Sequence, residues 1–211
     1  MVVIYLQSAY LFYYPIKEYY SLKYFKKLKW IGIIILPVLI AQSPFIIFLL
    51  KNSLIDSINI KSNFLINLIV NQICVASFEE VFFRGLIFNS IWQLSKKLNL
   101  STFLSSLIFL NFHLNKIETD FAILQSTSIF LGGFFLAIIF NYYKSIWPPL
   151  LFHFSHNFFI KIFNEIFLNT QIEYGFINYW QFSLEILIYL VLIYYHKFYN
   201  NEELLNREMN S

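Results

Sequence analysis

The sequence predicts an all-α fold, a polytopic bundle of about five to seven transmembrane helices that forms one membrane domain over residues 1–211. Apolar residues make up 58% of the chain and charged residues 13%, whereas a soluble domain has about 25% charged residues. Several uncharged runs approach the roughly 20 residues that a helix needs to cross a bilayer. No internal repeat or low-complexity linker divides the chain.

The predicted helices follow one another along the chain. Apolar runs occupy residues 30–50, 62–78, 98–115, 121–143, 145–160 and 182–195. The second run could continue past its charged residues as far as residue 95, or residues 84–97 could lie flat as an amphipathic helix. Residues 1–14 are apolar but lack the basic start and cleavage site of a signal peptide, so they suit a partial span or an interfacial segment.

Basic residues indicate the orientation in a cell membrane, because short cytoplasmic loops carry an excess of lysine and arginine. Five lysines precede the first long run: Lys17, Lys23, Lys26, Lys27 and Lys29. We therefore expect a multi-pass protein whose N-terminal basic segment is cytoplasmic. The net charge of +3 gives no argument for a nucleic-acid partner.

The first group of charges within apolar sequence consists of Glu79, Glu80 and Arg84. Charges inside membrane helices cost a few kcal/mol each, so they are functional candidates. Glu80 and Arg84 are four residues apart and share a helix face, which predicts an ion pair. Glu79 is rotated by about 100° around the helix axis from Glu80, so it can pair less easily with Arg84. Glu79 could act as a general base, while an ion pair at a membrane boundary explains the group equally well.

Polar residues also occur in two later runs. His113 lies near the end of the third run, one turn after Phe109, which we expect to pack rather than to react. His153 and Asn157 share a helix face, and both can donate hydrogen bonds to an oxyanion. His156 points elsewhere, which favours packing or a polar contact. Hydrogen bonding between helices explains each of these polar residues when it is taken alone. The occurrence of several of them in apolar runs favours a functional site.

The depths in the bilayer that the sequence predicts for Glu79 and His153 do not agree. Glu79 lies 17 residues before Lys96, whereas His153 lies nine residues after Lys144. At about 1.5 Å per helical residue, the two side chains lie at different distances from their basic turns. A tilted, broken or re-entrant segment would have to close that gap.

Other kinds of intramembrane hydrolase lack support. The sequence has no His-Glu-x-x-His zinc motif and no Gly-x-Ser-x-Gly nucleophile elbow. Asp56 and Asp120 lie in predicted loops, so no pair of aspartates lies in the spans. Cys74, the single cysteine, could be a nucleophile, but a buried membrane cysteine is more often a small apolar filler.

Taken together, the polar groups resemble the motifs of the CAAX protease and bacteriocin-processing family, also called the CPBP or Abi family of intramembrane proteases. Three motifs of that family occur here in the family's order: Glu79-Glu80-x-x-x-Arg84, Phe109-x-x-x-His113 and His153-x-x-x-Asn157. The resemblance covers a catalytic core at about residues 73–160.

The resemblance implies a glutamate-dependent endopeptidase that cleaves a peptide or a membrane-anchored protein tail at the lipid bilayer. Glu79 and His113 would hold and activate a water that attacks the scissile carbonyl. His153 and Asn157 would stabilise the resulting oxyanion. The pair formed by Glu80 and Arg84 would hold the first motif in place.

An older interpretation of the family makes the acids and histidines zinc ligands. Two imidazoles and one carboxylate are an acceptable zinc set, which here would be Glu79, His113 and His153. We favour the version without a metal because Asn157 suits an oxyanion better than it suits zinc.

Two other classes of function remain open. A membrane immunity or scaffold protein could keep the fold without turnover. A small proton-coupled transporter could use the buried acids and histidines as a proton relay, and it would keep its function when His153 or Asn157 is replaced.

Overall fold

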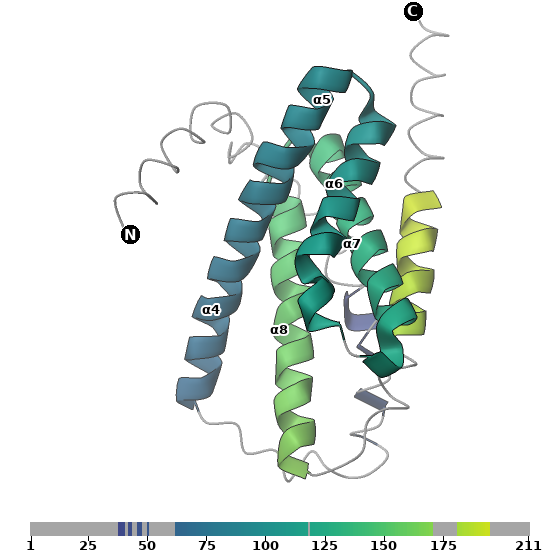
Figure 1. Ribbon diagram of the computed structural model, residues 1–211. Coiled ribbons are helices and arrows are strands. Elements are labelled where there is room, and N and C mark those ends of the chain that lie inside the picture. The colour runs from purple at the N-terminus through teal and green to yellow at the C-terminus, as the bar shows by residue number, and fades with distance from the viewer. Residues whose placement is uncertain are drawn as a thin grey trace, which may run out of the picture.

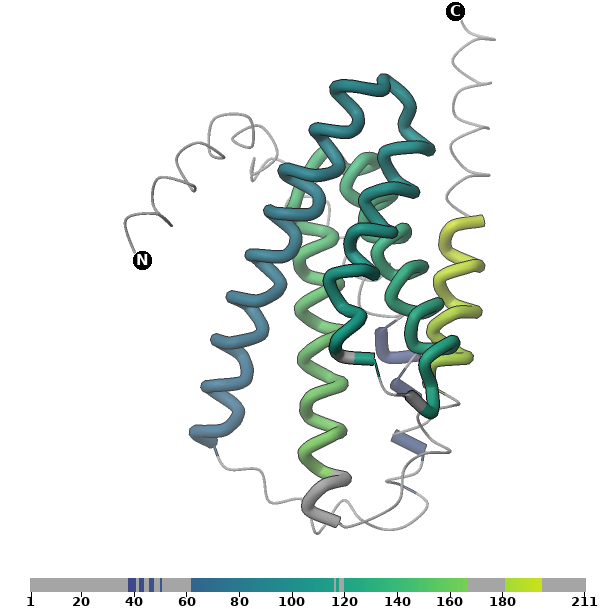
Figure 2. Tube along the Cα trace, in the orientation of Figure 1, coloured from purple at the N-terminus to yellow at the C-terminus, as the bar shows by residue number. Residues whose placement is uncertain are grey.

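The structure, a computed structural model, is helical in the residues that it describes, apart from short connections between helices (Figure 1). These residues are 38–40, 42, 43, 46, 47, 50, 62–117, 119–170 and 181–194 (Figure 2). The predicted segment at 1–14, the basic N-terminal segment and most of the first predicted run lie outside them. The all-α fold class is confirmed for this part of the chain.

The second predicted run forms one continuous helix that is 34 residues long, from Ser62 to Ser95. It consists of α4 (Ser62–Glu80), a π-helical segment (Val81–Phe88) and α5 (Asn89–Ser95). The expected continuation past the charged residues is therefore confirmed, and α5 extends α4 rather than lying flat (Figure 1). The wider π-helical turns begin directly after Glu80, and such turns often occur at functional sites.

The long helix lies along one side of the bundle, and the remaining helices lie beside it (Figure 1). After α6 (Leu98–His113) come two short 3-10 turns, Leu114–Lys116 and Thr119–Phe121, then α7 (Ala122–Tyr143) and α8 (Trp147–Thr170). α8 extends ten residues beyond the predicted end at residue 160. Its two prolines stand in the first turn, where backbone N–H groups have no partner within the helix in any case.

A last apolar helix, Gln181–Tyr194, lies beside α7 (Figure 1). In the described part of the chain, two helices are long and apolar enough to cross a membrane, Ser62–Ser95 and Ala122–Tyr143. The count of five to seven spans stays a prediction.

The turns at the expected cytoplasmic end lie at different heights, which resolves the apparent mismatch in depth. The turn between α5 and α6 reaches beyond the turn between α7 and α8 (Figure 1). The Lys144 ammonium lies 5.6 Å from the centre of the Trp92 ring, within α5. Fewer residues therefore separate His153 from the α7–α8 turn than separate Glu79 from the α5–α6 turn, although the two side chains lie at the same depth. The helix α8 needs no break.

Two glycines let α7 pack closely in the centre of the bundle. A Cβ atom at Gly133 would lie 3.0 Å from the ring of Phe109 on α6, and one at Gly132 would lie 3.4 Å from Tyr189. Around them, buried apolar side chains of α7, α8 and the last helix form a core that includes Phe135, Leu136, Ile139, Phe152 and Tyr189.

We predict that Gly133→Ala destabilises the protein more than Gly132→Ala. Both changes add about 1 kcal/mol of helix propensity, so the difference between them isolates the crowding of Phe109, for which we expect about 1–3 kcal/mol. Thermal unfolding of both variants in the same detergent measures it. Equal melting temperatures would contradict the close packing of α6 on α7.

Candidate active site

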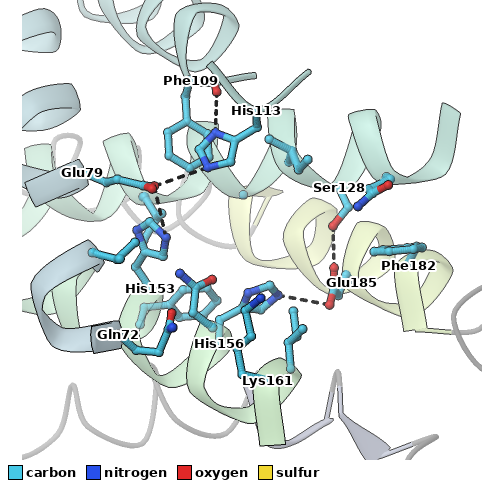
Figure 3. Close-up of a pocket in the computed structure, with 18 of the residues that line it drawn as sticks. Gln72, Glu79, Phe109, His113, Ser128, His153, His156, Lys161, Phe182 and Glu185 are labelled. Atoms are coloured by element: carbon cyan, nitrogen blue, oxygen red, sulfur yellow. Dashed lines mark hydrogen bonds and ion pairs between the residues drawn. The ribbon is translucent and has the colours of Figure 1, made fainter. Parts of the chain in front are cut away.

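A cavity of about 540 Å³ opens between the helices, and polar side chains line it. Figure 3 shows that these side chains come from opposite walls. The titratable residues and the motif amide on its lining are Glu79, His113, His153, His156, Asn157, Lys161, Glu185 and Tyr189. Of the residues expected in the site, Glu80 and Arg84 lie behind this wall.

Glu80 and Arg84 form the predicted ion pair, which the structure confirms. The Arg84 Nη1 donates to Glu80 Oε1 over 3.0 Å, and both side chains are almost fully buried. The Arg84 Nη2 donates to the backbone carbonyl of Gly133 over 3.0 Å. The guanidinium therefore satisfies a carboxylate on its own helix and also ties that helix to α7.

His153 connects this ion pair to the cavity. Its Nδ1 lies 2.7 Å from Glu80 Oε1, and because an ionised carboxylate can only accept, the imidazole donates here. Its other nitrogen, Nε2, then faces Glu79 Oε2 over 3.5 Å. Glu80 thus fixes both the position and the orientation of the His153 ring.

His113 approaches the same carboxylate oxygen from α6. Its Nδ1 donates to the carbonyl of Phe109 over 2.8 Å, because a carbonyl oxygen can only accept. Its Nε2 lies 3.4 Å from Glu79 Oε2. In the neutral imidazole this Nε2 carries a lone pair directed at the cavity. Two imidazoles from different helices therefore converge on Glu79 (Figure 3).

Phe109 packs as the sequence analysis expects. Its ring lies 4.4 Å from that of His113 and 6.0 Å from that of His153. The Arg84 guanidinium lies 4.9 Å from the ring centre, a distance at which a cation is attracted to the ring face. The aromatic residue of the second motif therefore holds both imidazoles and the arginine in place.

Asn157 lines the cavity one helical turn after His153. Cys74 is exposed and does not line the cavity, so its placement gives a nucleophilic cysteine no support. Among the residues that the structure describes, no group of three or more His, Cys, Asp or Glu side chains is arranged to hold a metal ion. The zinc set of Glu79, His113 and His153 therefore supplies no step in the mechanism below.

The sequence analysis did not identify a second polar group on the facing wall. The buried Glu185 accepts from Ser128 over 2.5 Å and from Gln181 over 2.9 Å, and His156 Nε2 lies 3.1 Å from it. His156 therefore makes the polar contact that was one of its two expected roles. An acid inside an apolar run was the available signal for Glu185, the same signal that singled out Glu79.

Fold and site together define a class: a helical membrane protein with a buried glutamate held between two histidines at an internal cavity. Residues 61–159 match a family model, that of the Rce1-like proteins, described as "Type II CAAX prenyl endopeptidase Rce1-like". This match confirms the resemblance to the CAAX protease and bacteriocin-processing family, a family of proteases, over the part of the chain that carries all three motifs. No curated protein and no solved structure matches the chain.

We predict that Arg84→Met lowers the free energy of unfolding by about 3–5 kcal/mol, because it leaves the carboxylate of Glu80 buried without its main partner. The double variant Glu80→Gln/Arg84→Met should be more stable than Arg84→Met alone, since the amide carries no charge. Denaturant unfolding in detergent micelles compares the three proteins. A double variant no more stable than the single one would show that the buried charge is not the cause.

Proposed function

We propose that the chain is an intramembrane endopeptidase that cleaves a peptide or a membrane-anchored protein tail with a water activated by Glu79 and His113. The observation that carries the proposal is the approach of two imidazole Nε2 atoms, at 3.4 and 3.5 Å, to one carboxylate oxygen of Glu79 on the cavity wall. The family match to a protease supports the same reaction class. Enclosure by apolar helices would strengthen the polar interactions of the bound substrate.

The first chemical step needs a proton acceptor beside the attacking water. Glu79 and the Nε2 of His113 can both accept a hydrogen bond from one water that bridges them on the cavity side, and one of the two takes its proton. The oxygen of that water attacks the carbonyl carbon of the scissile bond. After the C–N bond breaks, the same pair returns the proton to the leaving amine, so the enzyme ends in its starting state.

The oxyanion that forms needs hydrogen-bond donors already in place. His153 can donate from Nε2 while its Nδ1 stays bound to Glu80, which makes it an imidazolium. The Nδ2 amide group of Asn157 supplies a second donor from the next turn of α8. Two carboxylates, Glu79 and Glu80, then face Arg84 and the His153 imidazolium, so the buried cluster carries no net charge.

The substrate class follows from the location of the site. A cavity bounded by helices that are long and apolar enough to cross a membrane admits a chain held at the bilayer. The proposal covers peptides and membrane-anchored protein tails in general, and prenylated CAAX proteins are one kind of such tail.

We predict that Glu79→Gln and His113→Gln each lower kcat by about 10²–10⁴, the range expected when a general base is lost. Glu165→Gln is the matched control, because Glu165 lies on α8 but does not line the cavity. Purified protein with a reporter peptide library, read out by mass spectrometry, provides the measurement. Cleavage that survives both substitutions would remove the proposed mechanism, and solute flux in proteoliposomes without cleavage would favour a transporter.

We also predict that chelation leaves cleavage unchanged. The mechanism uses a carboxylate, imidazoles and an amide, so treatment with EDTA or 1,10-phenanthroline followed by gel filtration should alter kcat by less than about twofold. The metal content of the same sample is measured by mass spectrometry. Loss of activity on chelation and its return with added zinc would contradict the version without a metal.

A further inference from the structure

The cavity extends beyond the catalytic carboxylate, along the facing sides of α4 and α8. These two helices run in opposite directions and pack side by side (Figure 1). They approach each other where Glu79 Oε2 lies 3.5 Å from His153 Nε2. Gln72 on α4 and Lys161 on α8 also line the cavity, and the proposed mechanism uses neither of them.

Gln72 and Lys161 lie at nearly the same depth. Gln72 is seven residues before Glu79, and Lys161 is eight residues after His153. At about 1.5 Å per helical residue these separations are about 10 and 12 Å, and they run the same way because the helices are antiparallel. Figure 3 shows both side chains on the side of His153 that faces away from His113. One part of the cavity therefore lies between an amide and an ammonium group.

The side chain of Gln72 is a buried amide without a hydrogen-bond partner in the described part of the chain. The residue is 5% exposed, and Figure 3 shows its amide directed into the cavity. A buried polar group that lacks a partner is rare in proteins and calls for an explanation. Because no partner fixes this amide, it can turn its NH₂ group towards a bound molecule. Gln72 therefore indicates a binding site.

Lys161 provides the positive charge of this region. It is the only lysine or arginine on the described lining of the cavity, and none of the ion pairs among the described residues includes it. Glu185, the lining carboxylate across from the catalytic one, already accepts hydrogen bonds from Ser128 and Gln181. The charge of Lys161 is therefore available to an anion that enters the cavity.

We propose that Gln72 and Lys161 form a subsite that binds a carboxylate of the substrate. The ammonium and the amide NH₂ group each donate to this carboxylate, and the charge strengthens both hydrogen bonds. An extended peptide rises about 3.3 Å per residue, so the carboxylate lies about three residues from the scissile bond. It belongs either to the end of the peptide chain or to an acidic side chain.

This inference rests on the proposed endopeptidase activity and adds a substrate class to it. The test uses the reporter peptide library in three forms: with a free C-terminal carboxylate, with a C-terminal amide, and with a C-terminal amide plus one glutamate at varied positions. We expect a form that carries a carboxylate to have kcat/KM about 10–100-fold above the plain amide, as for a hydrogen bond to a charged group. Mass spectrometry should locate the cuts about three residues from that carboxylate. The preferred form identifies its source, the chain end or the side chain.

Variants assign this preference to the two residues. Lys161→Gln should lower kcat/KM for the preferred form to the value for the plain amide, and Gln72→Leu should lower it by about tenfold. The melting temperature of Gln72→Leu should equal or exceed that of the wild type, because no hydrogen bond within the described protein is lost. Lys97→Gln is the matched control, since it removes an exposed lysine outside the cavity, and it should keep the preference.

Several results would overturn the subsite and leave the endopeptidase intact. These are equal kcat/KM values for all three forms, a preference that survives Lys161→Gln, and a loss from Lys161→Gln that is equal for all forms. If the protein cleaves none of the peptides, the proposed function is wrong. Retention of the same peptides on the immobilised wild type and Lys161→Gln proteins then tests the subsite, and retention that does not depend on the carboxylate would overturn it as well.

Discussion

One buried oxygen atom, Oε1 of Glu80, is the point on which the site depends. It accepts a hydrogen bond from Arg84 over 3.0 Å and one from His153 over 2.7 Å. A carboxylate this deeply buried is tolerated only when charged or strongly polar donors surround it. The requirement to satisfy Glu80 therefore brings the first and third motifs together and leaves the other nitrogen of His153 facing Glu79.

The rest of the bundle supports that contact. Arg84 reaches past Glu80 to the carbonyl of Gly133, where α7 has no side chain and α6 can pack closely. Phe109 fills this space and contacts both imidazoles. Residues that look like separate motifs in the sequence thus form one packed unit, in which Glu79 alone of the two acids faces the cavity.

Local contacts could be predicted from the sequence, and distant ones could not. The pair of Glu80 and Arg84 follows from helix periodicity because the residues are one turn apart. The convergence of His113 and His153 on Glu79 depends on the relative heights of helices, and counting from the basic turns misjudged the height of His153. The length of α8 also escaped prediction, since the helix continues past residue 160 through polar residues, of which Lys161 and Asn164 line the cavity. The contact of His156 with the last helix joins residues 29 positions apart, which no local pattern encodes.

The claim that Glu79 activates a water, and does not itself attack the substrate, can be tested by a single-turnover cleavage in H₂¹⁸O. With enzyme in excess over peptide, the account predicts one ¹⁸O atom in the new carboxyl terminus of the product and none in the side chain of Glu79. An unlabelled product in the first turnover, with ¹⁸O recovered in the peptide that contains Glu79, would show a covalent acyl intermediate and contradict the account.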